Sequence, residues 1–107
     1  MKTFKEYQSL AAKVPVSLRN NRERLELPVS GLLEESGKIG SLFSSAAASG
    51  KFRLNEKQSG EIRDALADIL WYVALICGET GIAMQDVAEH SSAQLQSRIN
   101  GIDPDRR

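Results

Sequence analysis

An all-α chain, folded as a four-helix bundle, is the fold class that the sequence predicts. Apolar residues recur at helical spacing in four segments, and short polar or Gly/Pro-containing stretches separate these segments. No stretch alternates apolar and polar residues as a half-buried strand does. The length of 107 residues fits one domain, so we expect a single helical domain over 1–107 with a frayed tail at 100–107.

Capping residues and prolines bound the first two helices. Thr3 opens a capping-box pattern, so the first helix is expected to begin there and to end just before Pro15. Segment 16–27 is rich in Arg, Asn and Glu, which indicates a polar connection. Pro28 suits the first turn of a helix, so the second helix is expected to begin there and to stop near Gly50.

The third helix has the most regular pattern. It should run from about Glu56 to Glu79, with Asn55 as its N-cap and Gly81 as its stop. Its continuous apolar face consists of Ile62, Leu66, Ile69, Leu70, Val73, Ile76 and Cys77. A fourth helix is expected from about Met84 to Ile99.

The breadth of that apolar face predicts an oligomer. A chain of this length builds only a modest core of its own, and the third helix is apolar over a wider arc than one small neighbouring helix covers. We therefore expect the bundle to be completed by association into a homo-oligomer, either a dimer or a tetramer.

Composition excludes several classes of protein. Lys plus Arg and Asp plus Glu both number 14, and this balance argues against a binder of nucleic acid polymers. The single cysteine, Cys77, excludes an internal disulfide framework. The longest apolar stretch, 69–77, is shorter than the roughly 18 residues of a membrane span, and the N-terminus lacks a secretory pattern. We expect a cytoplasmic protein that does not enter a membrane.

Carboxylates lie early in the predicted second and third helices: Glu34, Glu35, Glu61, Asp64 and Asp68. If these helices pack antiparallel, their acidic edges can face each other, which is how helical bundles hold divalent metals. Carboxylate oxygens suit Mg²⁺ or Mn²⁺. The alternative is a solvated acidic surface, because neither a histidine nor a complete ligand set accompanies these residues.

Two segments resemble the motifs of the MazG-like nucleoside triphosphate pyrophosphohydrolases. The run G-L-L-E-E-S-G-K-I at 31–39 is similar to the first motif, G-L-x-x-E-x-G-E-(V/I), and A-L-A-D-I-L-W-Y-V-A at 65–74 is similar to the second, E-L-x-D-(V/I)-L-W-Y-(L/V)-A. The resemblance covers about residues 4–98. It implies an all-α NTP pyrophosphatase fold, known dimeric relatives, and Mg²⁺-dependent cleavage of a nucleoside triphosphate into a monophosphate and pyrophosphate.

The resemblance assigns site residues but leaves two positions unmatched. Glu35 and Asp68 match catalytic metal ligands, and Glu34 matches an extra acidic residue of some relatives. The family's second glutamate in the first motif is Lys38 here, and the glutamate of the second motif is Ala65. Two of four expected carboxylates are therefore replaced, which weakens cation binding.

Two hypotheses address this loss. In one, the Lys38 ammonium occupies the metal position and pairs with Glu35 and Asp68. In the other, Glu61, one turn before the missing carboxylate, reaches inward as a third metal ligand. Asp64 is expected to point roughly 100° away from that position and to contribute less.

Nucleotide contacts are less well marked. The family's N-x-x-K-L motif in the fourth helix is replaced here, which leaves Arg98 as the candidate phosphate contact. Trp71 is a candidate for stacking on the base, or for packing in the core or an interface.

Two functions stay open: a nucleotide pyrophosphohydrolase, and a non-catalytic helical dimer that binds a nucleotide or a protein partner.

Overall fold

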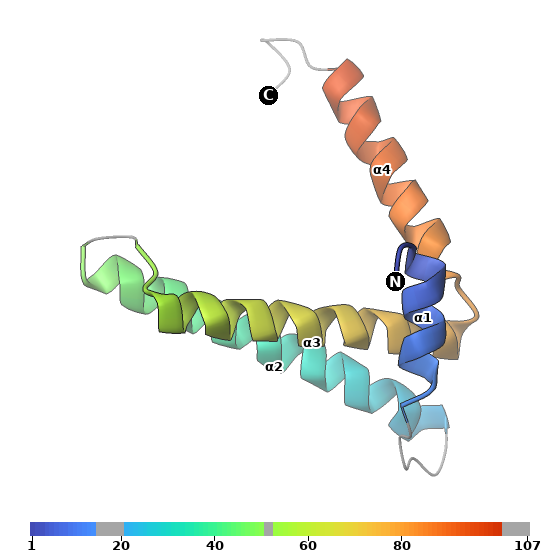
Figure 1. The fold of residues 1–107 in the computed structure, drawn as a ribbon, viewed down its shortest axis with the longest axis horizontal. Helices are drawn as coiled ribbons and strands as arrows, with labels where there is room; N and C mark the ends of the chain where they lie inside the picture. Colours follow the sequence, from blue (N-terminus) through green and yellow to red (C-terminus); the bar gives the residue numbers. More distant parts are fainter. Residues whose placement is uncertain (15–20, 51–52, 102–107) are drawn as a thin grey trace.

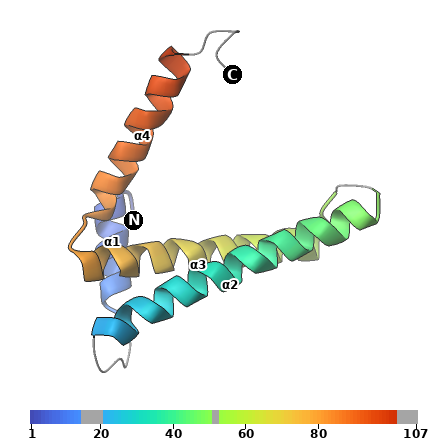
Figure 2. The ribbon, with the colours of Figure 1, turned by 180° about the vertical axis from the view of Figure 1, so that it is seen from behind.

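A computed structural model describes residues 1–14, 21–50 and 53–101. The described part contains helices and no strand, which confirms the all-α class. Helices α2 and α3 form a long antiparallel hairpin, α1 crosses the C-terminal end of α3, and α4 leaves that end at a steep angle (Figures 1 and 2). The four helices are α1 (Phe4–Ala12), α2 (Asn21–Ala48), α3 (Glu56–Thr80) and α4 (Met84–Asn100).

Two side-chain caps and one glycine define three of the predicted boundaries. The Glu6 N–H donates to Thr3 Oγ1 at 3.1 Å, so Thr3 is the N-cap of α1. Asn55 and Gln58 form a complete capping box at the start of α3. Gly81 ends α3 in the left-handed conformation, with φ of 73°, which glycine adopts without a steric penalty.

The predicted start of the second helix at Pro28 is wrong. Helix α2 begins at Asn21, two turns earlier, and Pro28 lies inside it with a fully buried side chain. An interior proline removes one backbone hydrogen bond at a cost of about 3 kcal/mol. Burial of the apolar ring offsets part of this cost. Residues 16–20 of the predicted connection lie outside the described residues.

The small core lies where α1, α3 and the start of α4 meet. Its buried members are Ala11, Ala74, Cys77 and Met84, with partly buried Tyr7, Leu70, Trp71 and Val73 packed around them. Gln8 of α1 fastens this junction, because its Nε2 donates to the Ile82 carbonyl at 3.0 Å and its Oε1 accepts from the Met84 N–H at 2.8 Å. The core therefore fixes the departure of α4 from α3.

Helix α4 does not lie along the hairpin within one chain. It contacts α1 and α3 but not α2, and its residues from 91 to 100 are all exposed. The tail from 102 onward, part of the segment expected to be frayed, is outside the described residues.

No single described helix is long and apolar enough to cross a bilayer, although α3 and α4 together, bent by 112°, meet the same length and composition criteria.

A glycine permits the close approach of α2 and α3. A Cβ at Gly31 would lie 2.4 Å from Cζ of Tyr72 and within 2.8 Å of both Cε atoms of that ring. By contrast, a Cβ at Gly37 or Gly40 would meet nothing within 4 Å. The Tyr72 ring therefore packs directly on the backbone of α2.

We expect Gly31→Ala to lower the free energy of unfolding by about 1–3 kcal/mol, because the added methyl group forces the Tyr72 ring and α2 apart. The matched control, Gly37→Ala, should raise it by up to about 1 kcal/mol through helix propensity alone. Urea titration followed by circular dichroism measures both. Equal stabilisation by the two substitutions would show that the helices do not meet at Gly31.

Candidate functional site

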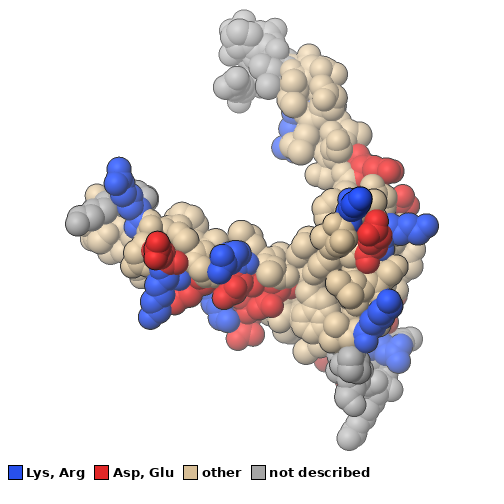
Figure 3. Space-filling view, in the orientation of Figure 1, with Lys and Arg blue, Asp and Glu red and all other residues tan. Residues whose placement is uncertain are grey.

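A hollow of about 560 Å³ opens between α2 and α3 in the middle of the hairpin. Its volume lies within the range of small-ligand sites. Figure 3 shows Asp and Glu side chains gathered along this part of the hairpin, with Lys and Arg side chains among them. The lining residues are Glu35, Lys38, Ser41 and Leu42 of α2, and Glu61, Asp64, Ala65 and Asp68 of α3.

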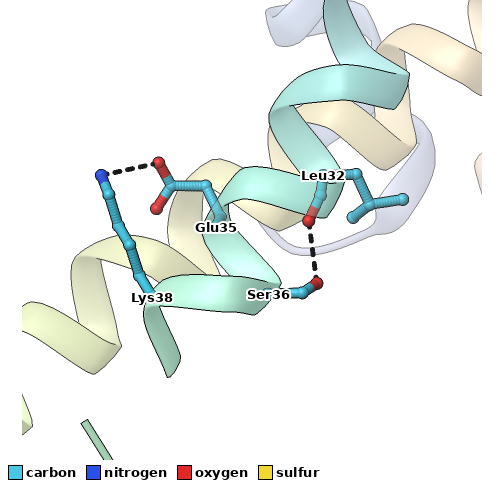
Figure 4. A network of polar contacts seen from close by, with 4 residues as sticks. All are labelled: Leu32, Glu35, Ser36 and Lys38. Atoms are coloured by element: carbon cyan, nitrogen blue, oxygen red, sulfur yellow. Dashed lines mark hydrogen bonds and ion pairs between the residues drawn. The ribbon is translucent and has the colours of Figure 1, made fainter. Parts of the chain in front are cut away.

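Glu35 is the buried charged residue of the described chain, with 6% of its surface exposed. The Lys38 ammonium, one helical turn further along α2, donates to Glu35 Oε1 at 3.0 Å (Figure 4). An ionised carboxylate is stable in such a place only when it is paired or hydrogen-bonded. The hydrogen bond to Glu35 and its charge, with smaller contributions from Glu34 and Asp68, raise the pKa of Lys38 above its ordinary value.

Helix α3 supplies three exposed carboxylates opposite this pair. Glu61, Asp64 and Asp68 line the hollow together with Ala65, whose small side chain is 3% exposed. Asp64, expected to point roughly 100° away from Ala65, nevertheless lines the hollow. Although Asp64 is far around the helix from Ala65, it follows Glu61 by three residues and precedes Asp68 by four, so all three carboxylates share one face.

The charges of the hollow favour a cation. Four carboxylates and one ammonium line it, which leaves a formal excess of negative charge. In the described ranges, however, no three His, Cys, Asp or Glu side chains lie close enough together to hold a metal ion. Mg²⁺ commonly uses only one or two carboxylates together with waters and substrate phosphates. The described residues therefore do not form a preformed metal cage.

Three residues predicted for the site lie elsewhere. Glu34 lines a neighbouring hollow of about 410 Å³, together with Tyr72 and Gly31. Trp71 packs against the core at the α1–α3 junction, and its Nε1 is buried without a partner. Arg98 is exposed on α4, which does not contact α2. Of the residues predicted for the site, the described chain thus brings only Glu35, Glu61 and Asp68 into the hollow between α2 and α3.

Two lining residues were not predicted. Ser41 follows Lys38 by three residues, and Leu42 follows Glu35 by seven, so both continue the same face of α2. That spacing could have identified them, but an apolar residue at helical spacing, such as Leu42, can be a core position as well as the wall of a hollow.

Comparisons of this chain with protein-family models, with curated proteins and with solved structures find no match.

Tyr72 lines the neighbouring hollow with Glu34, and its pKa responds to the charged residues of both hollows. Burial, followed by the charges of Asp68, Glu35 and Glu34, raises the pKa of this phenol above 10, and Lys38 opposes them. In a Tyr7→Phe background, we expect Asp68→Asn to move the Tyr72 pKa back towards 10, measured by phenolate absorbance between pH 8 and 12. An unchanged titration would mean that Asp68 does not act on this ring.

Proposed function

We propose that this chain is a MazG-like nucleoside triphosphate pyrophosphohydrolase, which cleaves a nucleoside triphosphate into a monophosphate and pyrophosphate. One observation carries the proposal: Glu35, Glu61, Asp64 and Asp68, from two antiparallel helices, line one hollow of nucleotide size. The resemblance of segments 31–39 and 65–74 to the family motifs supports the same reading.

In this proposal the hollow receives the triphosphate together with Mg²⁺ or Mn²⁺. One or two of the carboxylates that line it, from Glu35 of α2 and Glu61, Asp64 and Asp68 of α3, would bind the ion together with waters and phosphate oxygens. When bound, such an ion would supply screening of the phosphate charges and a lower pKa for a bound water. Glu34, in the adjoining hollow, adds negative charge beside the site.

Low turnover follows from two residues of the hollow. Lys38 engages the Glu35 carboxylate, and Ala65 contributes a methyl group where relatives of this type carry a further carboxylate. Each change removes negative charge from the place where a divalent ion would bind. We therefore expect catalysis slower than the usual range of enzymes, below about 1 s⁻¹.

A pyrophosphate-release assay with Mg²⁺ or Mn²⁺, across canonical and modified triphosphates, tests the proposal. We expect slow release that falls at least about tenfold in Glu35→Gln and is unchanged in Glu79→Gln, an exposed glutamate outside the hollow. Lys38→Glu combined with Ala65→Glu should raise the rate. Absence of release across the panel by the folded protein would contradict catalysis.

The second candidate function is a non-catalytic helical protein that binds a nucleotide or a protein partner through the same hollow. The Glu35–Lys38 ion pair favours it, because the most buried carboxylate already has a cation. Under this alternative the protein binds triphosphates without releasing pyrophosphate, and the double variant described above gains metal affinity without gaining turnover.

We also propose that a second copy of the chain covers part of its surface. The accessible surface is 8312 Å², whereas a compact monomer of 11.8 kDa exposes about 5,900 Å². The radius of gyration is 17.2 Å, against about 13 Å for a compact chain of this length. Large apolar side chains are exposed on α2, α3 and α4, including Leu33 (72%), Leu66 (52%) and Ile99 (60%). An excess of about 2,400 Å² per chain matches what an extensive dimer interface buries.

Size-exclusion chromatography with light scattering should give a mass of at least twice 11.8 kDa. Leu66→Asp should shift the protein towards the monomer, because a charge cannot be buried unpaired in an apolar interface. Lys57→Asp, at an exposed polar position of the same helix, is the control. A wild-type monomer at micromolar concentration would exclude the assembly.

A further inference from the structure

Helix α2 carries an exposed stripe that contains no charged residue. Its members recur every three or four residues and therefore share one side of the helix. All of them are exposed: Val29, Leu33, Ser36, Gly40, Phe43 and Ala47. Leu33 exposes 72% of its surface and Phe43 47%, although burial of such a side chain contributes about 1.5–3 kcal/mol. Among the described helices α2 contacts only α3, so neither α1 nor α4 covers this α2 stripe.

The α2 stripe and the hollow lie on opposite faces of the hairpin. Because α2 packs only on α3, the buried Glu35 marks the side of α2 that faces α3. Viewed from the N-terminus of α2, the stripe lies about 80–160° clockwise from Glu35, whereas Lys38 of the hollow lies about 60° anticlockwise from it. A partner that covers the stripe therefore leaves the hollow open.

Helix α3 extends the uncharged surface. Tyr72 marks the side of α3 that faces α2, because its ring packs on Gly31. Viewed from the N-terminus of α3, the 52% exposed Leu66 lies about 120° clockwise from Tyr72, whereas Asp64 of the hollow lies about 80° anticlockwise. Since α2 and α3 are antiparallel (Figures 1 and 2), the same sense of rotation places Leu66 on the face that carries the α2 stripe.

The middle of the α2 stripe suits the close approach of another helix. A Cβ at Gly40 would meet nothing within 4 Å, so packing inside the chain does not explain a glycine that costs about 1 kcal/mol in a helix relative to alanine. Ser36 Oγ donates to the Leu32 carbonyl at 2.8 Å (Figure 4). Its hydroxyl is thus already bonded, and covering it leaves no polar group without a partner.

The spacing of the α2 stripe reads the same in both directions along the helix. Two copies related by a two-fold axis meet through the same patch, and each residue pairs with its counterpart twice. If the axis passes midway between Ser36 and Gly40, Leu33 of each copy lies opposite Phe43 of the other, and Ser36 lies opposite Gly40. Small residues then meet at the centre and large apolar residues meet on either side of it.

We propose that the α2 stripe pairs antiparallel with the same stripe of a second copy, across a two-fold axis between Ser36 and Gly40. The inference rests on the assembly proposed above and assigns a surface and a direction to it. The accessible surface exceeds that of a compact monomer by about 2,400 Å², which is enough for an extensive dimer interface. The two hollows then open away from the interface, so a ligand in the hollow does not compete with assembly.

Complementary charges test the pairing. Leu33→Asp and Phe43→Lys each place two unpaired charges in the homodimer interface, so each should raise the Kd of the dimer at least about a hundredfold. When the two variants are mixed, the introduced carboxylate meets the introduced ammonium, and the second Leu33–Phe43 contact is native. A mixed dimer should therefore form at concentrations at which each variant alone is a monomer. Native mass spectrometry with one chain isotope-labelled measures it, and circular dichroism confirms that each variant is folded.

Leu95→Lys, at an exposed apolar position of α4, provides the control. Mixed with Leu33→Asp, it should give no more mixed dimer than the wild type gives with Leu33→Asp. A larger amount would place α4 on the stripe and overturn the proposal, and so would absence of the Leu33→Asp/Phe43→Lys dimer.

The remaining outcomes separate this interface from the proposals on which it rests. A dimer that neither single variant weakens would retain the assembly and exclude the α2 stripe as its interface, whereas a wild-type monomer would exclude both. Pyrophosphate release is an independent result, because Leu33 and Phe43 do not line the hollow.

Discussion

The direct packing of α2 on α3 at Gly31 and Tyr72 is the contact on which the rest of the structure depends. Because an aromatic ring touches the backbone of α2 there, the two helices run close together for the next turns. Glu35 lies one turn after Gly31 and is consequently buried, and Ala65 is buried opposite it on α3. A bulkier residue at position 31 would separate the helices and expose the carboxylate to water. The chemistry of the hollow is thus set by a residue that takes no part in it.

Two kinds of carboxylate result from this geometry. Glu35 is buried and already paired, whereas Glu61, Asp64 and Asp68 are exposed and line the opposite wall. Exposed acidic groups cost little to keep ionised, and a buried one requires a compensating charge at all times. The hollow therefore combines one carboxylate that is buried and paired with three that are exposed.

Much of the fold and part of the site could be predicted from local sequence. Helix α3 could be predicted almost to the residue, because Asn55 and Gly81 have backbone requirements that few other residues meet. The start of α2 could not, because the rule for Pro28 considers its missing N–H and not the burial of its ring. The direction of α4 depends on tertiary contacts that carry no local signal.

Those contacts centre on Gln8, whose side-chain amide bonds the Ile82 carbonyl within the short link between α3 and α4 and the Met84 N–H at the start of α4. Helix α1, the shortest helix that the structure describes, therefore fixes the direction in which α4 leaves α3. Because Gln8 holds α4 in one direction relative to α3, little orientational entropy would be lost if another molecule covered the exposed apolar side chains of α4.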